Sequence, residues 1–152
     1  MPTMAEEDVD RVQKLFGGKQ KLGRHVKTRW DAHELLKYGI KGKAFHHFVV
    51  KLGRVHRGEF LHTIGMSERT YQRHMKVPAK EIGRDQSGRA WKFAEILMEA
   101  TAVLGSQEAA EEWLETPALA LNRRRPIDLL TTPSGTELVS DLLVRLKYGV
   151  YT

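Results

Sequence analysis

The sequence of 152 residues contains no cysteine, which excludes both disulfide bonds and metal sites built on thiolates. No apolar run approaches the length that crosses a bilayer, and the acidic first residues lack the apolar stretch of an export signal. These absences argue against export and against membrane insertion. We therefore expect a cytoplasmic protein without membrane contact.

Patterns typical of catalytic and cofactor sites are also missing. The seven histidines include no pair with the H-E-x-x-H spacing of a metal site, and Gly17-Gly18-Lys19 lacks the strand and spacing of a phosphate loop. A group of glutamates in one short segment fits the solvent face of a helix and indicates no acid–base pair. These are Glu108, Glu111, Glu112 and Glu115. We expect no enzyme, no metal and no cofactor in this chain.

Charge is divided unevenly along the chain, whose formal net charge is +6. Residues 1–80 hold 17 Lys and Arg against 8 Asp and Glu, a balance of +9, whereas residues 81–152 hold 8 against 11, a balance of −3. A basic half and a mildly acidic half predict two surfaces with different partners, and the basic surface suits a polyanion. A basic face that is merely solvated is the alternative.

Helical periodicity dominates the sequence and useful β-alternation is absent, so we predict an all-α fold. Residues 1–43 are rich in Lys, Arg and Gly and show only weak periodicity, from Trp30 to Tyr38. This segment is predicted to be a basic N-terminal arm, partly ordered, with one helix. Residues 44–52 carry apolar side chains at helical spacing and are predicted to form the next helix.

Residues 57–76 have the pattern of two short helices joined by a tight turn. The first helix ends at Gly65, Ser67 is a favourable N-cap for the second, and Pro78 ends the second. Helices joined this closely cross at a steep angle, as in a helix-turn-helix motif. The residues expected to pack inside are Phe60, Leu61, Ile64 and Tyr71.

The second of these helices carries polar residues of the types that read DNA. Arginine pairs with guanine and glutamine with adenine in the major groove, while Lys76 and Ser67 are placed for phosphate contacts. The candidate DNA-binding residues are Ser67, Glu68, Arg69, Gln72, Arg73 and Lys76. An ordinary helical hairpin with a solvated charged face is the alternative.

The second half of the chain predicts four further helices. A long amphipathic helix over residues 89–104 is followed by a short one over residues 107–114. Residues 126–130 indicate one helical turn, and Ser134 with Glu137 predicts a capping box that begins a final helix. The side chains of the final helix that are expected to face a core are Leu138, Val139, Leu142, Leu143 and Leu146.

The C-terminal tail ends in aromatic and apolar residues, where tails are usually polar. Gly149 fits a left-handed helix cap, with Val150 as the apolar contact that follows it. Tyr148 and Tyr151 are then available to a partner. The run Arg123-Arg124-Arg125 is predicted to be a solvated loop, with contact to an acidic partner or to phosphate as the alternative.

Residues 87–152 carry many spaced matches to one known family. The matches include Ser87–Phe93, Leu104-Gly105, Trp113-Leu114, Pro117–Leu121, Pro126–Thr132, Gly135, Arg145 and Tyr148–Val150. Met66–Arg73 adds an Arg-Thr pair and a following Arg. In these residues the chain resembles the Xre/MbcA/ParS antitoxins, the partners of RES-domain toxins. One departure is the loop Asn122–Arg125, where the family commonly has glycines.

The resemblance implies a Cro-like helix-turn-helix followed by a small helical toxin-binding domain, usually as a homodimer within a hetero-oligomeric complex. It implies the antitoxin of a type II toxin–antitoxin system, which occludes the active-site cleft of an NAD-consuming RES-domain toxin and represses its own operon by binding operator DNA. The NAD chemistry belongs to the toxin, so the chain itself needs no cofactor. The predicted parts are a basic arm (1–43), a helix-turn-helix DNA-binding region (44–86) and a toxin-binding helical domain (87–152).

The predicted toxin-binding residues lie at the end of the chain. Arginine supplies charge-assisted hydrogen bonds to an acidic cleft wall, and tyrosines offer rigid apolar area with a polar end. The candidates are Arg145, Tyr148, Gly149, Val150 and Tyr151. Trp113 is predicted to belong to the core rather than to this surface. The alternative function is a stand-alone helix-turn-helix transcriptional regulator without a toxin partner.

Overall fold

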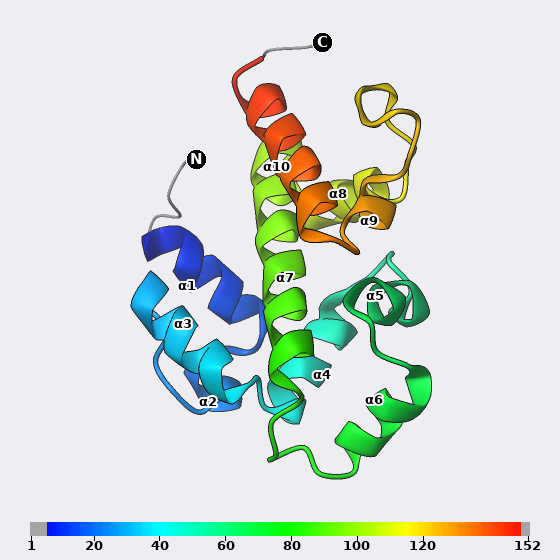
Figure 1. Cartoon of the computed structure of the whole chain (residues 1–152). Coiled ribbons are helices and arrows are strands. Elements are labelled where there is room, and N and C mark those ends of the chain that lie inside the picture. Colours follow the sequence, from blue (N-terminus) through cyan, green and yellow to red (C-terminus); the bar gives the residue numbers. More distant parts are fainter. Residues whose placement is uncertain (1–5, 150–152) are drawn as a thin grey trace. The chain divides into compact units, whose positions relative to one another are not determined.

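The computed structural model describes residues 6–149 (Figure 1), and within this range it confirms an all-α fold without β-strands. Pairing of the β-bridge type occurs within this range only at two isolated bridges, Lys41 with Glu81 and Ala118 with Arg124. The helices are α1 (Glu6–Leu15), α2 (Gly18–Leu22), α3 (Arg29–Tyr38), α4 (Gly42–Lys51), α5 (Arg57–Ile64), α6 (Glu68–Met75), α7 (Arg84–Leu104), α8 (Gln107–Leu114), η1 (Leu119–Leu121), α9 (Pro126–Leu129) and α10 (Pro133–Lys147). No helix of the described range combines the length and the apolar character needed to cross a membrane.

The chain folds into two compact units, and it passes between them three times. Residues up to Lys51 together with Met66–Ala94 form unit 1, and Leu52–Gly65 together with the residues from Glu95 onward form unit 2. The helix α5 therefore belongs to unit 2 and α6 to unit 1, while α7 contributes to both. The three-part division expected from the sequence stays a prediction.

The N-terminal segment contains more helix than the sequence predicted, because residues 6–38 form α1, α2 and α3 instead of an arm with one helix. Val9, Val12 and Phe16 are buried and follow the spacing of one helical face, which the surrounding charged residues obscured. The ring of Phe16 stacks on Phe48, with centroids 4.9 Å apart, and on Trp91 at 5.4 Å. An aromatic core thus ties this segment to α4 and α7 within unit 1.

The start of α10 also differs from the prediction. The N-cap is Thr132, whose hydroxyl oxygen accepts a hydrogen bond from the N–H of Gly135 at 3.0 Å, and Pro133 occupies the first turn. The predicted Ser134–Glu137 capping box is therefore wrong. A proline in the first helical turn has a preset φ and no N–H to leave unpaired, which favours the earlier start.

Glu111 of α8 lies in the core of unit 2, where the sequence placed it on the solvent face. Only 1% of it is exposed, and its carboxylate accepts hydrogen bonds from the N–H groups of Gly53, Arg54 and Val55 at 3.2, 2.8 and 2.9 Å. The side chain of Gln107 donates to it as well. Glu111 therefore accepts the hydrogen bonds of the backbone N–H groups in the turn that leads into α5.

Candidate functional site

The helix α6 is held by a cap at its start and by one buried aromatic side chain. The hydroxyl oxygen of Ser67 accepts a hydrogen bond from the N–H of Thr70 at 3.1 Å, as expected of an N-cap. Tyr71 is 1% exposed, and its hydroxyl shares a 2.5 Å hydrogen bond with Nδ1 of His46 on α4. Its ring lies against Phe45, with centroids 5.9 Å apart. The face of α6 that carries Tyr71 is thus fixed against α4.

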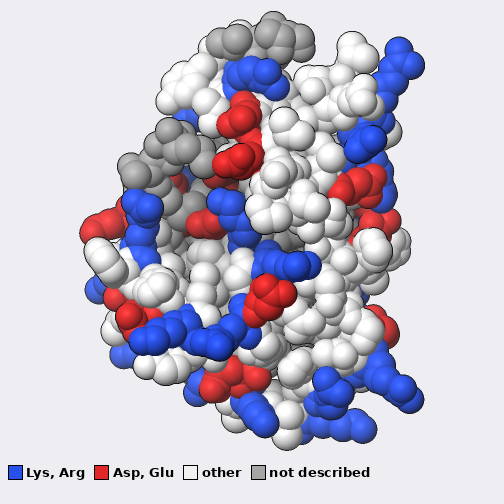
Figure 2. Space-filling view, viewed as in Figure 1, with Lys and Arg blue, Asp and Glu red and all other residues white. Residues whose placement is uncertain are grey.

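The opposite face of α6 is open to solvent and polar. The candidate residues on it are all exposed: Glu68, Arg69, Gln72, Arg73 and Lys76. Figure 2 shows Lys and Arg side chains gathered at the lower right, over the place of α6 in Figure 1. The sixth candidate, Ser67, already uses its hydroxyl for the cap and donates to the hydroxyl of Thr70. Contact with DNA stays a prediction for all six.

Two further lysines lie beside the end of α6, and sequence reasoning missed them. The N–H of Gly42 donates to the carbonyl of Lys80 and the N–H of Lys43 to the carbonyl of Pro78, both at 2.9 Å. These bonds bring the first turn of α4 next to the segment that follows α6. Lys43 and Lys80 come from positions 37 residues apart in the sequence, so no local pattern could reveal their proximity.

His74 adds no charge to this surface at neutral pH. Burial lowers the pKa of its imidazole, and the neighbouring cations of Arg73 and Lys80 lower that pKa further. At neutral pH the imidazole is therefore uncharged, whereas the surrounding arginines and lysines are charged. The positive potential around α6 comes from those side chains alone.

Replacing Tyr71 by phenylalanine tests how α6 is held. The change keeps the ring in the core and removes the hydroxyl that bonds to His46, so we expect the free energy of unfolding to fall by about 1 kcal/mol. Urea denaturation followed by circular dichroism measures this. Tyr38→Phe is the matched control, because the Tyr38 side chain is 58% exposed and should change stability little. Equal effects of the two changes would contradict this account of α6.

A second exposed surface lies along α10. Leu138, which the sequence assigned to the core, is 54% exposed, so that prediction is wrong. Arg145 follows seven residues later and Tyr148 three residues after that, a spacing that places all three on one face of the helix. Tyr148 is 70% exposed. An apolar side chain, a cation and an aromatic ring thus form one stripe, here called the α10 stripe.

Arg145 is the polar member of the α10 stripe and is half-buried. Its Nε is buried and has no hydrogen-bond partner among the described residues. Gly149 has φ of +70°, so the left-handed cap expected at this position is present. Two of the predicted toxin-binding residues, Val150 and Tyr151, lie outside the described residues.

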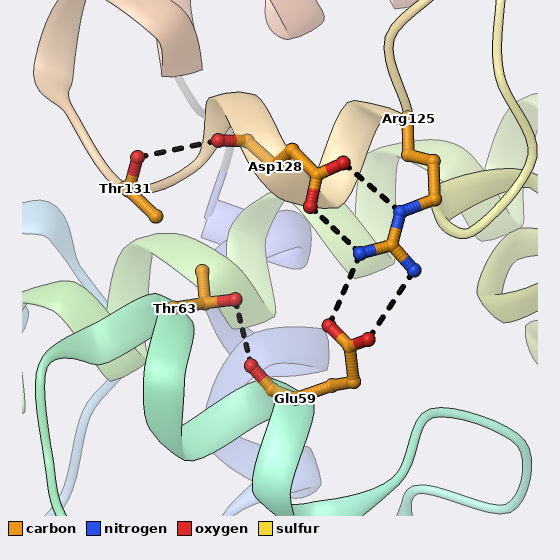
Figure 3. Close-up of polar contacts among 5 residues, drawn as sticks. All are labelled: Glu59, Thr63, Arg125, Asp128 and Thr131. Atoms are coloured by element: carbon orange, nitrogen blue, oxygen red, sulfur yellow. Dashed lines mark hydrogen bonds and ion pairs between the residues drawn. The ribbon is translucent and has the colours of Figure 1, made fainter.

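Arg125 forms a clasp within unit 2 that the sequence did not predict (Figure 3). Its guanidinium donates to both carboxylate oxygens of Asp128 on α9, at 2.9 and 2.7 Å, and to both oxygens of Glu59 on α5, at 3.3 and 3.4 Å. The hydrogen bonds from Arg125 hold the pKa of the Asp128 carboxyl below its usual range, and the carboxylates raise the pKa of Arg125. Arg125 is thus structural, unlike its neighbours in the arginine run.

Within residues 6–149, no group of three or more His, Asp or Glu side chains lies close enough to hold a metal ion. The arrangement offers two open surfaces instead, a basic face on α6 and the mixed α10 stripe.

Two family models match this chain in consecutive regions. Residues 33–95 match the antitoxin Xre-like helix-turn-helix domain, and residues 99–149 match the antitoxin Xre/MbcA/ParS C-terminal toxin-binding domain. The first region includes α6 and its support on α4, and the second contains the α10 stripe.

Individual relatives are Xre antitoxins as well. Antitoxin Xre of Yersinia enterocolitica is 29% identical over 97 residues, which are 63% of this chain and 65% of the relative. Antitoxin Xre of Photorhabdus laumondii is 27% identical over 95 residues (62% and 64%), and that of Pseudomonas putida is 34% identical over 65 residues (43% and 41%). The chain thus spans just under two thirds of the first two relatives. The chain thus combines an Xre-like helix-turn-helix domain with a C-terminal toxin-binding domain of the Xre/MbcA/ParS type.

Proposed function

We propose that this chain is the antitoxin of a type II toxin–antitoxin system, which neutralises a RES-domain toxin that consumes NAD and represses its own operon. The observation that carries the proposal is the pair of open surfaces, one in each matched region. The basic face of α6 suits DNA, and the α10 stripe suits a protein. The chain itself is not an enzyme and needs no cofactor, because the NAD chemistry belongs to the toxin.

The α6 face reads operator DNA in the major groove. Arg69, Gln72 and Arg73 offer hydrogen bonds to base edges, and each bidentate pair contributes about 1–3 kcal/mol of discrimination. Lys76, together with Lys43 and Lys80 beside the end of α6, contacts phosphates. A homodimer places two such helices on two half-sites of the operator, about one turn of DNA apart.

The α10 stripe occludes the active-site cleft of the toxin. Aromatic side chains and arginines dominate the binding energy of protein interfaces, and the stripe supplies both in Tyr148 and Arg145. The guanidinium of Arg145 offers charge-assisted hydrogen bonds to carboxylates on the cleft wall. Leu138 adds apolar area about two helical turns before Arg145.

DNA binding by α6 is tested with the double variant Arg69→Ala/Arg73→Ala. Loss of two base-reading cations should weaken binding to DNA from the chain's own promoter at least tenfold and reduce the slope of log affinity against log salt by about 2. Fluorescence anisotropy over a salt series measures both. The control, Lys14→Ala/Lys19→Ala, removes two exposed cations from α1 and α2. Equal losses in the two variants would mean that charge alone, and not α6, governs binding.

Toxin binding is tested by co-purifying the chain with the product of the adjoining gene, followed by an assay of NAD consumption. We expect a stable complex that silences the NAD loss caused by the partner alone.

Deleting residues 147–152 should abolish neutralisation and spare DNA binding. Unchanged neutralisation by the truncated chain would contradict the assignment of the tail, and no complex at all would favour a stand-alone transcriptional regulator.

A further inference from the structure

The loop between α8 and α9, residues 118–125, is closed by its own backbone. The N–H of Ala118 donates to the carbonyl of Arg124 at 3.1 Å, and the N–H of Arg123 donates to the carbonyl of Ala118 at 2.9 Å. The Arg125 clasp anchors the end of the loop to Asp128 and Glu59. These bonds constrain the residues between the anchors.

The tip of this loop has an unfavourable backbone conformation. Asn122 and Arg123 have φ of 58° and 64°, and they are the two non-glycine residues with positive φ in the described chain. Asparagine adopts the left-handed region more readily than most residues, but arginine does so at a cost that glycine would avoid. Residues in such strained backbone conformations cluster at binding and catalytic sites. The conformation therefore marks this loop as a candidate binding site.

The same loop exposes an apolar side chain beside two cations. Leu119 is 78% exposed, and Arg123 and Arg124 are exposed and form no ion pair with any described residue. Unit 2 carries 7 Lys and Arg against 10 Asp and Glu, a balance of −3, so the two free cations stand out in an acidic surrounding. Leu119, Arg123 and Arg124 are called the loop tip below.

We propose that the loop tip is a second docking point for the toxin, at which Leu119 enters an apolar hollow and the two arginines pair with carboxylates on its rim. This inference rests on the proposed function and adds a contact outside the α10 stripe. Two observations favour a protein over DNA as the occupant. An exposed leucine gains little from a phosphate backbone, and unit 2 also exposes carboxylates such as Glu108 and Glu112, which repel phosphate.

The first test is Arg123→Gly, because stability and binding should move in opposite directions. Release of the strained conformation should raise the melting temperature by a few degrees, whereas loss of the cation should weaken binding to the co-purified toxin about tenfold. Differential scanning calorimetry and isothermal titration calorimetry measure the two effects. Asn122→Gly is the matched control, and it should leave toxin affinity within about twofold of the wild type. A merely structural Arg123 would show no loss of affinity in the glycine variant.

The second test reverses the charge with Arg123→Glu/Arg124→Glu. We expect a loss of toxin affinity greater than tenfold and unchanged affinity for promoter DNA. Toxin affinity equal to that of the wild type would overturn the inference and leave the proposed function intact, and so would a loss confined to DNA binding, which would assign the loop tip to phosphate. Failure of the wild-type chain itself to bind the toxin would overturn both.

Discussion

Replacing Gly135 by alanine is expected to destabilise the protein by roughly 3 kcal/mol or more, although alanine is normally the better helix former. A Cβ atom at this position of α10 would lie 2.0 Å from the carbonyl oxygen of Leu129 and 2.9 Å from its carbonyl carbon. Both are backbone atoms at the end of α9, so no side-chain rotation relieves the clash. The helices α9 and α10 would have to move apart. Urea denaturation followed by circular dichroism measures the loss.

Gly88→Ala is the matched control for this prediction. Gly88 lies within α7, and a Cβ added there would meet no atom within 4 Å. Its replacement should therefore stabilise the protein by about 0.5–1 kcal/mol, as expected for an unhindered helical glycine. If both glycine variants gained stability, the close approach of α10 to Leu129 would not exist in solution.

The second large effect is expected for Glu111→Ala. The change removes the acceptor for three backbone N–H groups, of which the one at Val55 is buried and those at Gly53 and Arg54 are part-buried. Each unsatisfied buried donor costs about 1–3 kcal/mol, partly offset where water enters, so the total should be on the order of 4 kcal/mol. The midpoint of thermal unfolding should fall accordingly.

Two variants separate the role of Glu111 from that of a general surface charge. Glu111→Gln keeps one acceptor oxygen and should destabilise the protein by about half as much. Glu112→Ala removes the neighbouring exposed carboxylate, whose contact with Arg54 is 3.4 Å long, and should change stability by no more than about 0.5 kcal/mol. Equal effects at positions 111 and 112 would refute the capping role of Glu111.

The exposed face of α6 could be predicted from the sequence because the start of a helix and its buried side are determined by residues close together in the chain. Gly65, the Ser67 cap and the buried Tyr71 together fix which side of the helix faces out. The short helix at 107–114 and the left-handed Gly149 follow from the same kind of local evidence. These features required no knowledge of distant contacts.

Features that depend on contacts between distant residues were missed. Glu111 has the polar character of its exposed neighbours, and nothing in its own helix indicates that the backbone at 53–55 lies opposite. The exposure of Leu138 depends in the same way on which face of α10 the rest of unit 2 covers. The Arg125 clasp joins residues 66 positions apart. The Arg125 clasp and the place of Leu138 in the α10 stripe therefore emerged only from the structure, whereas Arg145 and Tyr148 were candidates from the sequence.

The path of the chain between the two units limits how its two matched regions can be exchanged by recombination. The segment 52–65 lies within the matched helix-turn-helix region, but three of its backbone N–H groups depend on Glu111 and its Glu59 carboxylate pairs with Arg125. A chimera that exchanged residues 99–149 alone would separate both pairs. An exchange of the C-terminal region would therefore require matching residues at 52–65 to travel with it.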